Sequence, residues 1–493
     1  MSNRIRFLLG ASPVEVAVDD PTRTVLQFLR SDPARHGTKE GCAEGDCGAC
    51  TVAVGERTPD GRMSYRAVNA CIQFLPTLDG KQLLTVEDIA GAAGDALHPV
   101  QQALVDAHGS QCGFCTPGFA MSLFVGHALD RAAGRVPSRD AVNDRLAGNL
   151  CRCTGYRPIV DAAQRAAAIP EPEHWTAFKS KSSAALASMA RSGTLVIDTG
   201  TRHYYAPRDI DALADVLERH PDACILAGGT DVGLWVTKQH RSLGTVVYVG
   251  NVASLKVVED RSKTWWIGAG ASFSEAGRAF ADLHPDFAEL VRRIGSPQIR
   301  NAGTVGGNIA NGSPIGDSMP ALIALGARLH LRRGRRRRDI ALEEFFVAYR
   351  QTALEPGEFV EGVSVPKLGP NDRFATYKIS KRFDQDISAL CPAFRITLAG
   401  GVVREARIAF GGMAATPKRA PATEAALVGS PWSEETVRRA KSALMEDYRP
   451  IGDMRASARY RMTVAGNMLI RFFLESEGRG GRTRVIAPRE SAA

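Results

Sequence analysis

Long apolar segments are missing from this sequence of 493 residues. No run of about 18 consecutive apolar residues occurs, so we predict no membrane-spanning helix and no membrane partner. The N-terminal segment Met1 to Gly10 has only a short apolar stretch, Phe7 to Leu9, and no small-residue cleavage pattern follows it. Because this segment lacks the features of a secretory signal, we expect a cytoplasmic protein.

Cysteine is scarce and unevenly placed. Ten cysteines are far too few for a disulfide scaffold of this length. Eight of them precede residue 154, and only Cys224 and Cys391 follow it. Such clustering favours metal binding in a reducing compartment, where thiolates remain available as ligands.

Basic charge is concentrated in one place. The formal net charge is +9, but six arginines lie in the run Arg332 to Arg338, and without them the excess is +3. Nucleic-acid-binding proteins spread basic residues over a face or along a helix, so we expect no nucleic-acid partner. The run itself is interpreted as a basic hairpin-like turn that forms a solvated loop, with docking of a partner as the alternative.

The spacing of apolar residues divides the chain into regions of different type. Alternation from Ile5 to Val18 predicts a hairpin that starts a small mixed sheet around a short helix. Helical spacing then takes over, followed by a Ser, Lys and Ala-rich linker and two larger regions that mix strands and helices. We predict a multidomain α+β protein with regions 1–84, 85–168, a linker 169–200, 201–370, 371–478 and a flexible tail 479–493.

A first cysteine constellation has the spacing C-x4-C-x2-C, with a fourth cysteine on the next predicted strand, Tyr65 to Cys71. This spacing is typical of a plant-type 2Fe-2S cluster, in which one tight loop supplies three thiolates and an adjacent strand the fourth. The alternatives are a zinc site or free buried cysteines, but structural zinc sites usually present two C-x2-C pairs. The predicted ligands are Cys42, Cys47, Cys50 and Cys71.

Glycines in the first cysteine loop have a predicted role. They allow positive φ angles and let backbone N–H groups approach the sulfurs, where such donors help to set the reduction potential. These residues are Gly41, Gly45 and Gly48.

A second constellation combines C-x2-C with a distant C-x-C, and consists of Cys112, Cys115, Cys151 and Cys153. Its spacing alone fits zinc nearly as well as iron and sulfur, and a redox-active dithiol is a third possibility. Pro117 and Pro158 can each open a helix at its first turn. That geometry would bring the four sulfurs together where helices meet.

Two glycine-rich segments are candidates for holding phosphates, residues 225–233 and residues 301–308. In the first, an apolar strand enters a Gly-Gly turn before a predicted helix, so that N–H groups and the helix dipole favour an anion. Each segment alone is equally compatible with an ordinary tight turn. No G-x-G-x-x-G motif occurs, so a Rossmann dinucleotide site has no sequence support.

Three segments in combination resemble the iron–sulfur portion of molybdenum hydroxylases of the xanthine dehydrogenase family. They are Gly-Cys-Ala-Glu-Gly-Asp-Cys-Gly-Ala-Cys, Gln-Cys-Gly-Phe-Cys-Thr-Pro-Gly and Asn-Leu-Cys-Arg-Cys-Thr-Gly-Tyr-Arg-Pro. The resemblance implies a second 2Fe-2S cluster on the Cys112 to Cys153 constellation. It also implies the order of folds: a ferredoxin-like β-grasp domain, a helical 2Fe-2S domain, a two-subdomain α/β FAD-binding domain and a C-terminal α+β flavoprotein domain.

The same resemblance implies an FAD site between two α/β subdomains. The first glycine segment would surround the pyrophosphate, with Leu226, Ala227, Gly228, Gly229, Thr230, Asp231, Val232 and Gly233. Further polar groups of the cofactor would be held by Thr304, Gly307 and Asp317, and the rings would lie near Ile294, Val360 and Lys378. The position of Lys378 depends entirely on the family match, because an isolated lysine is ordinarily a solvated surface residue.

The implied function is electron transfer. A partner subunit with the molybdenum cofactor would oxidise hypoxanthine and xanthine to urate, since little sequence after the flavin region remains for that cofactor. Electrons would move through the cluster of the Cys112 constellation, then through that of the Cys42 constellation, to FAD. NAD+ would then accept them from FAD. No catalytic residue is assigned to this chain, and a dimer of heterodimers is expected. The alternatives are an aldehyde or N-heterocycle hydroxylase, a stand-alone iron–sulfur flavoprotein reductase, and a zinc-containing interaction module.

Overall fold

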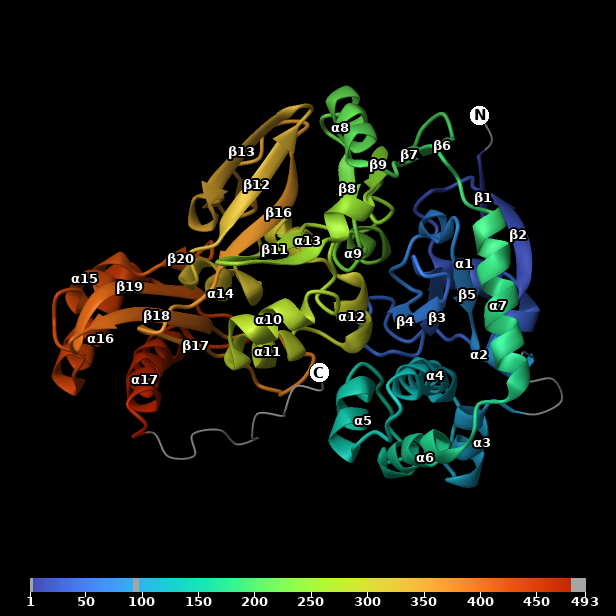
Figure 1. Ribbon diagram of the computed structural model, residues 1–493, viewed down its shortest axis with the longest axis horizontal. Coiled ribbons are helices and arrows are strands. Elements are labelled where there is room, and N and C mark those ends of the chain that lie inside the picture. The colour runs from blue at the N-terminus through green and yellow to red at the C-terminus, as the bar shows by residue number, and fades with distance from the viewer. Residues whose placement is uncertain (1–2, 92–96, 480–493) are drawn as a thin grey trace. The chain divides into compact units, whose positions relative to one another are not determined.

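The computed structural model describes residues 3–91 and 97–479 (Figure 1). Two compact units make up the chain, and each draws on several separate segments. Unit 1 consists of residues 1–216, 222–252 and 295–303, and unit 2 of residues 217–221, 253–294 and 304–493. The predicted tail lies outside the described residues except for Arg479. Among the described helices, none is both long and apolar enough to cross a bilayer.

Unit 1 begins with a mixed sheet that holds a short helix, as the alternating pattern predicts. The strand order is β2-β1-β5-β3-β4, with β1 parallel to β5 and the other pairs antiparallel. Helix α1 starts with a capping box between Thr24 and Gln27 and buries Val25, Leu26 and Leu29. The bounds are β1 (Arg4–Leu9), β2 (Ser12–Ala17), α1 (Val25–Arg30), η1 (Pro33–Arg35), β3 (Thr51–Arg57), β4 (Met63–Asn69), η2 (Leu75–Leu78) and β5 (Gln82–Leu84).

A helical region follows, which confirms the change of period after Thr85. Pro117 and Pro158 stand in the first turns of α4 and α6, where a missing N–H costs nothing. Helix α4 is buried along most of its length and is central to this region. The bounds are α2 (Val86–Gly91), α3 (Pro99–Asp106), α4 (Thr116–Ala132), α5 (Arg139–Leu146) and α6 (Arg157–Ala168).

The segment interpreted as a linker contains a helix, α7 (Glu173–Ser188). It packs beside the first sheet, and Trp175 is 1% exposed between Phe124, His98 and Phe178. Only Trp175, Ser182 and Leu186 of this helix are buried. Because only three of its 16 residues are buried, the helix shows too little apolar periodicity to be predicted from the sequence.

The rest of unit 1 is a four-stranded sheet with the order β6-β7-β9-β8. Strands β7 and β8 run parallel to β9, whereas β6 pairs antiparallel with β7. The bounds are β6 (Leu195–Asp198), β7 (His203–Ala206), α8 (Ile210–Arg219), β8 (Cys224–Leu226), α9 (Val232–Thr237), β9 (Thr245–Tyr248) and α12 (Pro297–Ala302).

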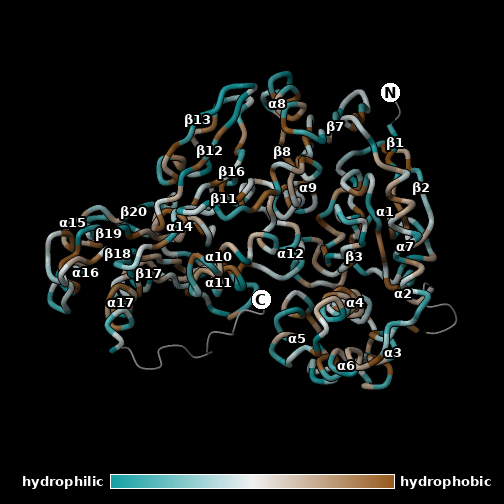
Figure 2. Tube along the Cα trace, viewed as in Figure 1, coloured by the Kyte–Doolittle hydropathy of each residue, from teal (hydrophilic) through white to brown (hydrophobic). Residues whose placement is uncertain are grey.

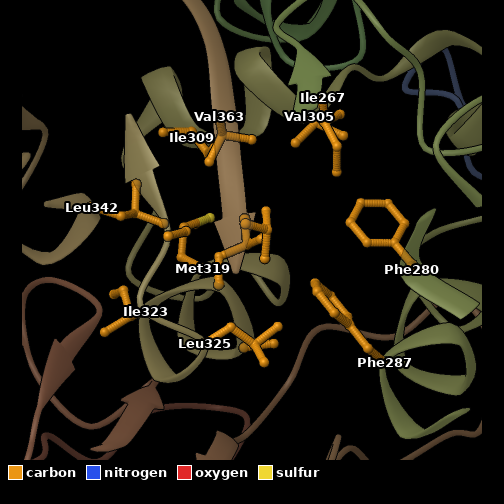
Figure 3. Packing of buried hydrophobic residues seen from close by; sticks show 14 of the residues in the cluster. Ile267, Phe280, Phe287, Val305, Ile309, Met319, Ile323, Leu325, Leu342 and Val363 are labelled. Atoms are coloured by element: carbon orange, nitrogen blue, oxygen red, sulfur yellow. The ribbon is translucent and has the colours of Figure 1, made fainter. Parts of the chain in front are cut away.

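Unit 2 contains a five-stranded antiparallel sheet, β10-β11-β16-β12-β13, over a large apolar core. Figure 3 shows Phe280 and Phe287 from two helices facing Met319 and Leu325 from a third segment. The bounds are η3 (Ala253–Lys256), β10 (Val258–Arg261), β11 (Thr264–Gly268), α10 (Gly277–Leu283), α11 (Pro285–Arg292), α13 (Val305–Asn311), α14 (Ser318–Ala324), β12 (Arg328–Arg333), β13 (Arg336–Ala341), η4 (Leu342–Glu344), β14 (Phe346–Ala348), β15 (Gln351–Thr352) and β16 (Phe359–Pro366).

A second sheet in unit 2, β17-β18-β19-β20, carries three helices, as expected of a region that mixes strands and helices. Its core joins Phe394 and Phe410 of the sheet to Phe472 of the last helix. The bounds are β17 (Asp372–Thr376), β18 (Cys391–Ala399), β19 (Val402–Gly411), β20 (Lys418–Arg419), α15 (Pro421–Leu427), α16 (Glu434–Asp447) and α17 (Ala458–Ser476).

The arginine run lies in a hairpin, as predicted, and Arg333, Arg335, Arg336 and Arg337 are exposed, but Arg332 is buried and several of the arginines are paired. It forms the tip of the β12–β13 hairpin, which Figure 2 draws mostly in the hydrophilic colour. Arg332 is buried and donates to the carbonyl of Gly334 at 2.7 Å. Arg337 and Arg338 pair with Glu361 and Glu358 at 3.0 and 2.7 Å. Glutamates brought from later in the chain therefore offset much of the local charge.

Truncation of Trp175 to alanine should loosen the packing of α7. Removal of a buried aromatic side chain costs about 3–5 kcal/mol, because the cavity cannot fully collapse. Hydrogen exchange of the α4 and α7 amides measures this local free energy of opening.

Two control variants separate packing from other effects. Trp175→Phe should cost much less, because the indole N–H is buried without a hydrogen-bond partner in the structure. Lys181→Ala changes an exposed residue of the same helix and should have almost no effect. Equal protection in Trp175→Ala and Lys181→Ala would show that α7 is not anchored by this side chain.

Candidate functional site

The first four cysteines converge beside β3 and β4. Cys71 lies two residues beyond the end of β4, so it follows the strand rather than standing on it as predicted. The backbone N–H groups of Asp46 and Cys47 approach the Cys42 sulfur at 3.3 and 3.4 Å. Donors of this kind stabilise negative charge on a ligating sulfur.

The loop that carries Cys42 and Cys47 has the left-handed residues expected of it, with one difference. Gly45 and Gly48 have φ values of 82° and 72°, but the third left-handed residue is Ala43, with φ 55°, and not Gly41. A non-glycine residue pays a conformational cost in this region, so the surrounding contacts must hold it there.

The thiols of this set perturb one another strongly. The pKa of Cys47 and of Cys71 is raised, in each case first through contact with the Cys42 thiol. The pKa of Cys42 is correspondingly held far below its usual value by Cys47 and Cys71. Four thiols packed this closely cannot all ionise without a compensating cation, and a metal cluster would supply that charge.

The second cysteine set lies at the N-terminus of α4 and in the segment between α5 and α6. The sulfur of Cys153 is 3.8 Å from that of Cys151 and 3.7 Å from that of Cys112. Two thiolates on one tetrahedral metal ion at about 2.3 Å would stand about 3.8 Å apart, so these separations suit shared metal coordination. Among the described residues, no three His, Cys, Asp or Glu side chains are grouped to hold a metal ion. A cluster assignment therefore depends on the pairwise distances and on the comparisons below.

Polar neighbours affect the ionisation of the second set. Burial opposes ionisation of Cys151, but hydrogen bonds from the side chain and backbone of Thr154 lower its pKa to about 7. Burial and contact with Cys151 raise the pKa of Cys115 to about 12. The donor set is therefore already arranged for partial ionisation, which suits a thiolate metal site.

The two sets differ in exposure. Cys50 and Cys71 are 2% exposed, whereas the side chains of Cys112 and Cys153 lie at the surface. Apolar side chains surround the second set at the surface: Phe114, Leu150 and Tyr156 are 47%, 48% and 38% exposed. The second set is thus the one that another molecule can approach.

The first glycine segment joins β8 to α9 through a tight turn, as predicted. Gly229 has φ 72°, which favours glycine. A Cβ on Gly228 would lie 1.7 Å from the carbonyl oxygen of Ala302, and one on Gly233 would lie 2.7 Å from that of Ile72. The turn therefore packs directly against the end of α12 and against the residue that follows Cys71.

Most residues of the second glycine segment belong to helices rather than to a simple turn. It is the junction between α12 and α13, where Thr304 is the N-cap and its Oγ1 accepts from the N–H of Gly307 at 3.0 Å. A Cβ on Gly306 would clash with Ala269, so this glycine serves helix packing. The predicted cofactor residues Thr304 and Gly307 stand at the start of one helix.

Lys378 is buried, contrary to what is usual for a lysine. Its Nζ lies 2.5 Å from Asp317 Oδ2 and 3.1 Å from Ser388 Oγ, and Ser388 donates to the other oxygen of Asp317. Ser388 had no signal in the sequence. Ile294 and Val360 belong to the apolar core of the same unit, Ile294 partly buried and Val360 7% exposed. Unit 2 thus brings together Asp317 and Lys378, two of the residues that the resemblance implies.

Comparison with known protein families accounts for most of the chain. Residues 8–74 match a 2Fe-2S iron–sulfur cluster binding domain, and residues 85–164 a [2Fe-2S] binding domain. Residues 198–368 match the FAD binding domain in molybdopterin dehydrogenase, and residues 375–476 the CO dehydrogenase flavoprotein C-terminal domain.

Individual relatives agree with these matches. Xanthine dehydrogenase of Emericella nidulans is 31% identical over 95% of this chain, and the nicotinate hydroxylase hnxS of the same organism is 28% identical over 96%. The chain spans 38% and 40% of their lengths. A solved carbon monoxide dehydrogenase from Hydrogenophaga pseudoflava, which lacks the Mo-pyranopterin moiety, matches 56% of this chain and 97% of its own, with 29% identity and a TM-score of 0.53.

Fold, cysteine sets and family matches together define an iron–sulfur flavoprotein oxidoreductase that takes two 2Fe-2S clusters and FAD. Within that class, the chain belongs to the molybdopterin dehydrogenases, also called molybdenum hydroxylases, as an iron–sulfur and FAD-binding chain.

Replacement of Cys47 by serine should remove one cluster and spare the other. We expect the plant-type electron paramagnetic resonance signal to disappear and iron to fall from about four to about two per chain, because each 2Fe-2S cluster holds two irons. Cys224→Ser, at a half-buried cysteine outside both sets, should keep both signals. Loss of both signals, or of neither, in Cys47→Ser would refute the assignment.

Replacement of Gly228 by valine should release FAD while iron content stays unchanged. The side chain cannot fit beside the Ala302 carbonyl, so the turn must move. Gly244→Val is a matched control, because a Cβ there meets nothing within 4 Å. Flavin absorbance and iron analysis of the purified chain measure both outcomes, and full flavin retention in Gly228→Val would rule out a role of this turn in binding.

Proposed function

We propose that this chain transfers electrons in a xanthine-oxidising molybdenum hydroxylase that uses NAD+ as acceptor. The observation that carries the proposal is that unit 1 places two sets of four cysteines and the glycine turn of the flavin domain in one compact body. The first three curated relatives are all named xanthine dehydrogenase, with 31% identity each.

The cysteines would hold the two clusters in this proposal. Cys42, Cys47, Cys50 and Cys71 would bind one, and Cys112, Cys115, Cys151 and Cys153 the other. When bound, the clusters supply one-electron transfer and FAD supplies the paired electrons that hydride transfer to NAD+ requires. The protein holds the sulfurs close together, donates N–H groups to them and buries Cys50 and Cys71 of the first set.

A partner with the molybdenum cofactor would dock at the second cysteine set. Cys112 and Cys153 reach the surface, and exposed apolar residues lie around them, which is the pattern of a contact surface rather than of an isolated protein face. Electrons would enter there, pass to the first set and leave through FAD. We further propose a dimer of such two-chain complexes located in the cytoplasm.

A second candidate is an N-heterocycle hydroxylase with the same electron path. The nicotinate hydroxylase matches this chain over the same extent as the xanthine dehydrogenases do. Both candidates need the same cysteines and the same flavin turn, so the substrate alone separates them.

The anaerobic visible spectrum of the complex from its native host tests the proposal directly. Xanthine should bleach the flavin and iron–sulfur absorbance, and NAD+ should restore it. Bleaching by nicotinate but not by xanthine would favour the second candidate. Bleaching by NADH alone would keep the electron path and exclude xanthine, and no response to any of these compounds would contradict the function.

A further inference from the structure

Four polar side chains are buried together where the first cysteine loop meets the helical region. They come from the start of β3, from α4, from the segment after α5 and from α12, and each is 5% exposed or less. Buried polar groups of this kind need hydrogen-bond partners within the protein. The four residues are Thr51, Ser122, Asn149 and Gln298.

Asn149 is the centre of this network. Its Oδ1 accepts from Ser122 Oγ at 2.7 Å and from Gln298 Nε2 at 3.0 Å. Its Nδ2 donates to the carbonyl of Gly48 at 3.2 Å and to Thr51 Oγ1 at 3.3 Å. Both lone pairs and both N–H groups of the amide are thus used, which fixes the side chain in one orientation.

The residue after Asn149 links the two cysteine sets. The N–H of Leu150 donates to the carbonyl of Cys47 at 3.0 Å, and Leu150 is bonded directly to Cys151. A single hydrogen bond therefore completes an otherwise covalent route between a cysteine of the first set and a cysteine of the second. Electron tunnelling along bonds and a hydrogen bond is far more effective than a jump across an empty gap.

Close approach of the two backbones is built into the sequence. Gly48 has φ 72°, and a Cβ at this position would lie 2.1 Å from the carbonyl of Gly148. No side chain can stand between the two segments there. Asn149 then holds the carbonyl of Gly48, next to Cys47, so that the Cys47 to Leu150 hydrogen bond keeps its length.

We propose that Asn149 is a positioning residue for electron transfer between the two clusters, acting through the hydrogen bond from Leu150 to Cys47. The step moves one electron from the reduced cluster at the Cys151 set to the oxidised cluster at the Cys47 set, and it breaks no bond and moves no proton. This role rests on the proposed electron-transfer function, but it does not depend on which substrate the partner oxidises.

The test uses the full chain with both clusters and the variant Asn149→Leu, which keeps a similar volume and removes all four hydrogen bonds. After a light pulse that injects one electron from a photoreductant, the re-equilibration between the two clusters is followed by rapid freezing and electron paramagnetic resonance. We expect its rate to fall, because a lengthened or lost hydrogen bond between Leu150 and Cys47 leaves a gap in the bonded route between the two cysteine sets. The magnetic splitting between the two reduced clusters should also decrease, while iron content stays the same.

Control variants decide between positioning and general damage. Asn143→Leu changes an exposed residue of α5 in the same region and should leave the rate and the splitting unchanged. Thr51→Val keeps the shape of a β-branched strand residue and removes only the hydroxyl, which contacts Asn149, Gln298 and Gly48, so a smaller fall is expected. If Asn149→Leu loses iron, Thr51→Val provides the same test.

An unchanged rate and splitting in Asn149→Leu, or in Thr51→Val where the first variant loses iron, would overturn the proposal. Neither readout requires xanthine, NAD+ or the partner chain. A chain that fails to respond to xanthine in its native complex but shows the Asn149 effect would therefore contradict the proposed substrate and retain the positioning role.

Discussion

The close approach of cysteine sulfurs from separate segments constrains much of the local backbone of unit 1. Regular helices and strands cannot turn sharply enough, so both sets lie on irregular segments with left-handed residues. Ala43 has φ 55° and Tyr156 has φ 65°, and each costs about 1–2 kcal/mol relative to an ordinary conformation. Tyr156 is held because its hydroxyl accepts from the N–H of Cys151 at 2.9 Å. The backbone strain therefore occurs at residues close to the cysteines, where it helps to hold the sulfur atoms in position.

The same constraint explains how the segments of unit 1 pack. Since irregular loops cannot stabilise one another by regular ladders, the contacts between them are specific polar ones or very close backbone approaches. The turn after β8 lies against the residue that follows Cys71, Asn301 donates to the carbonyl of Ala67, and Lys81 reaches the hydroxyl of Tyr248 at 2.8 Å. The cysteine loops and the flavin turn are therefore parts of one packed body.

Local signals in the sequence predicted the cysteine sets, the helical region and most strands, because spacing and period are local properties. The family resemblance was also confirmed, together with its two cluster domains and its FAD domain. Contacts between distant segments could not be predicted. The buried ion pair of Lys378 depends on Asp317, 61 residues away, and the Arg332 run is offset by glutamates on a later segment. Helix α7 was missed because three buried side chains give almost no periodicity.

The comparisons do not distinguish one substrate from another. Relatives named for xanthine and for nicotinate match it over nearly its whole length and with similar identity, so the residues they share cannot select between these compounds. What the chain does specify is distance and order: a cysteine set that reaches the surface, a more buried set linked to it through Leu150, and a glycine turn packed beside the residue that follows Cys71. An arrangement fixed by backbone contacts tolerates exchange of surface residues around Phe114 and Leu150. In the proposed function these exposed residues form the docking surface, and the backbone contacts that connect the two cysteine sets do not depend on their side chains.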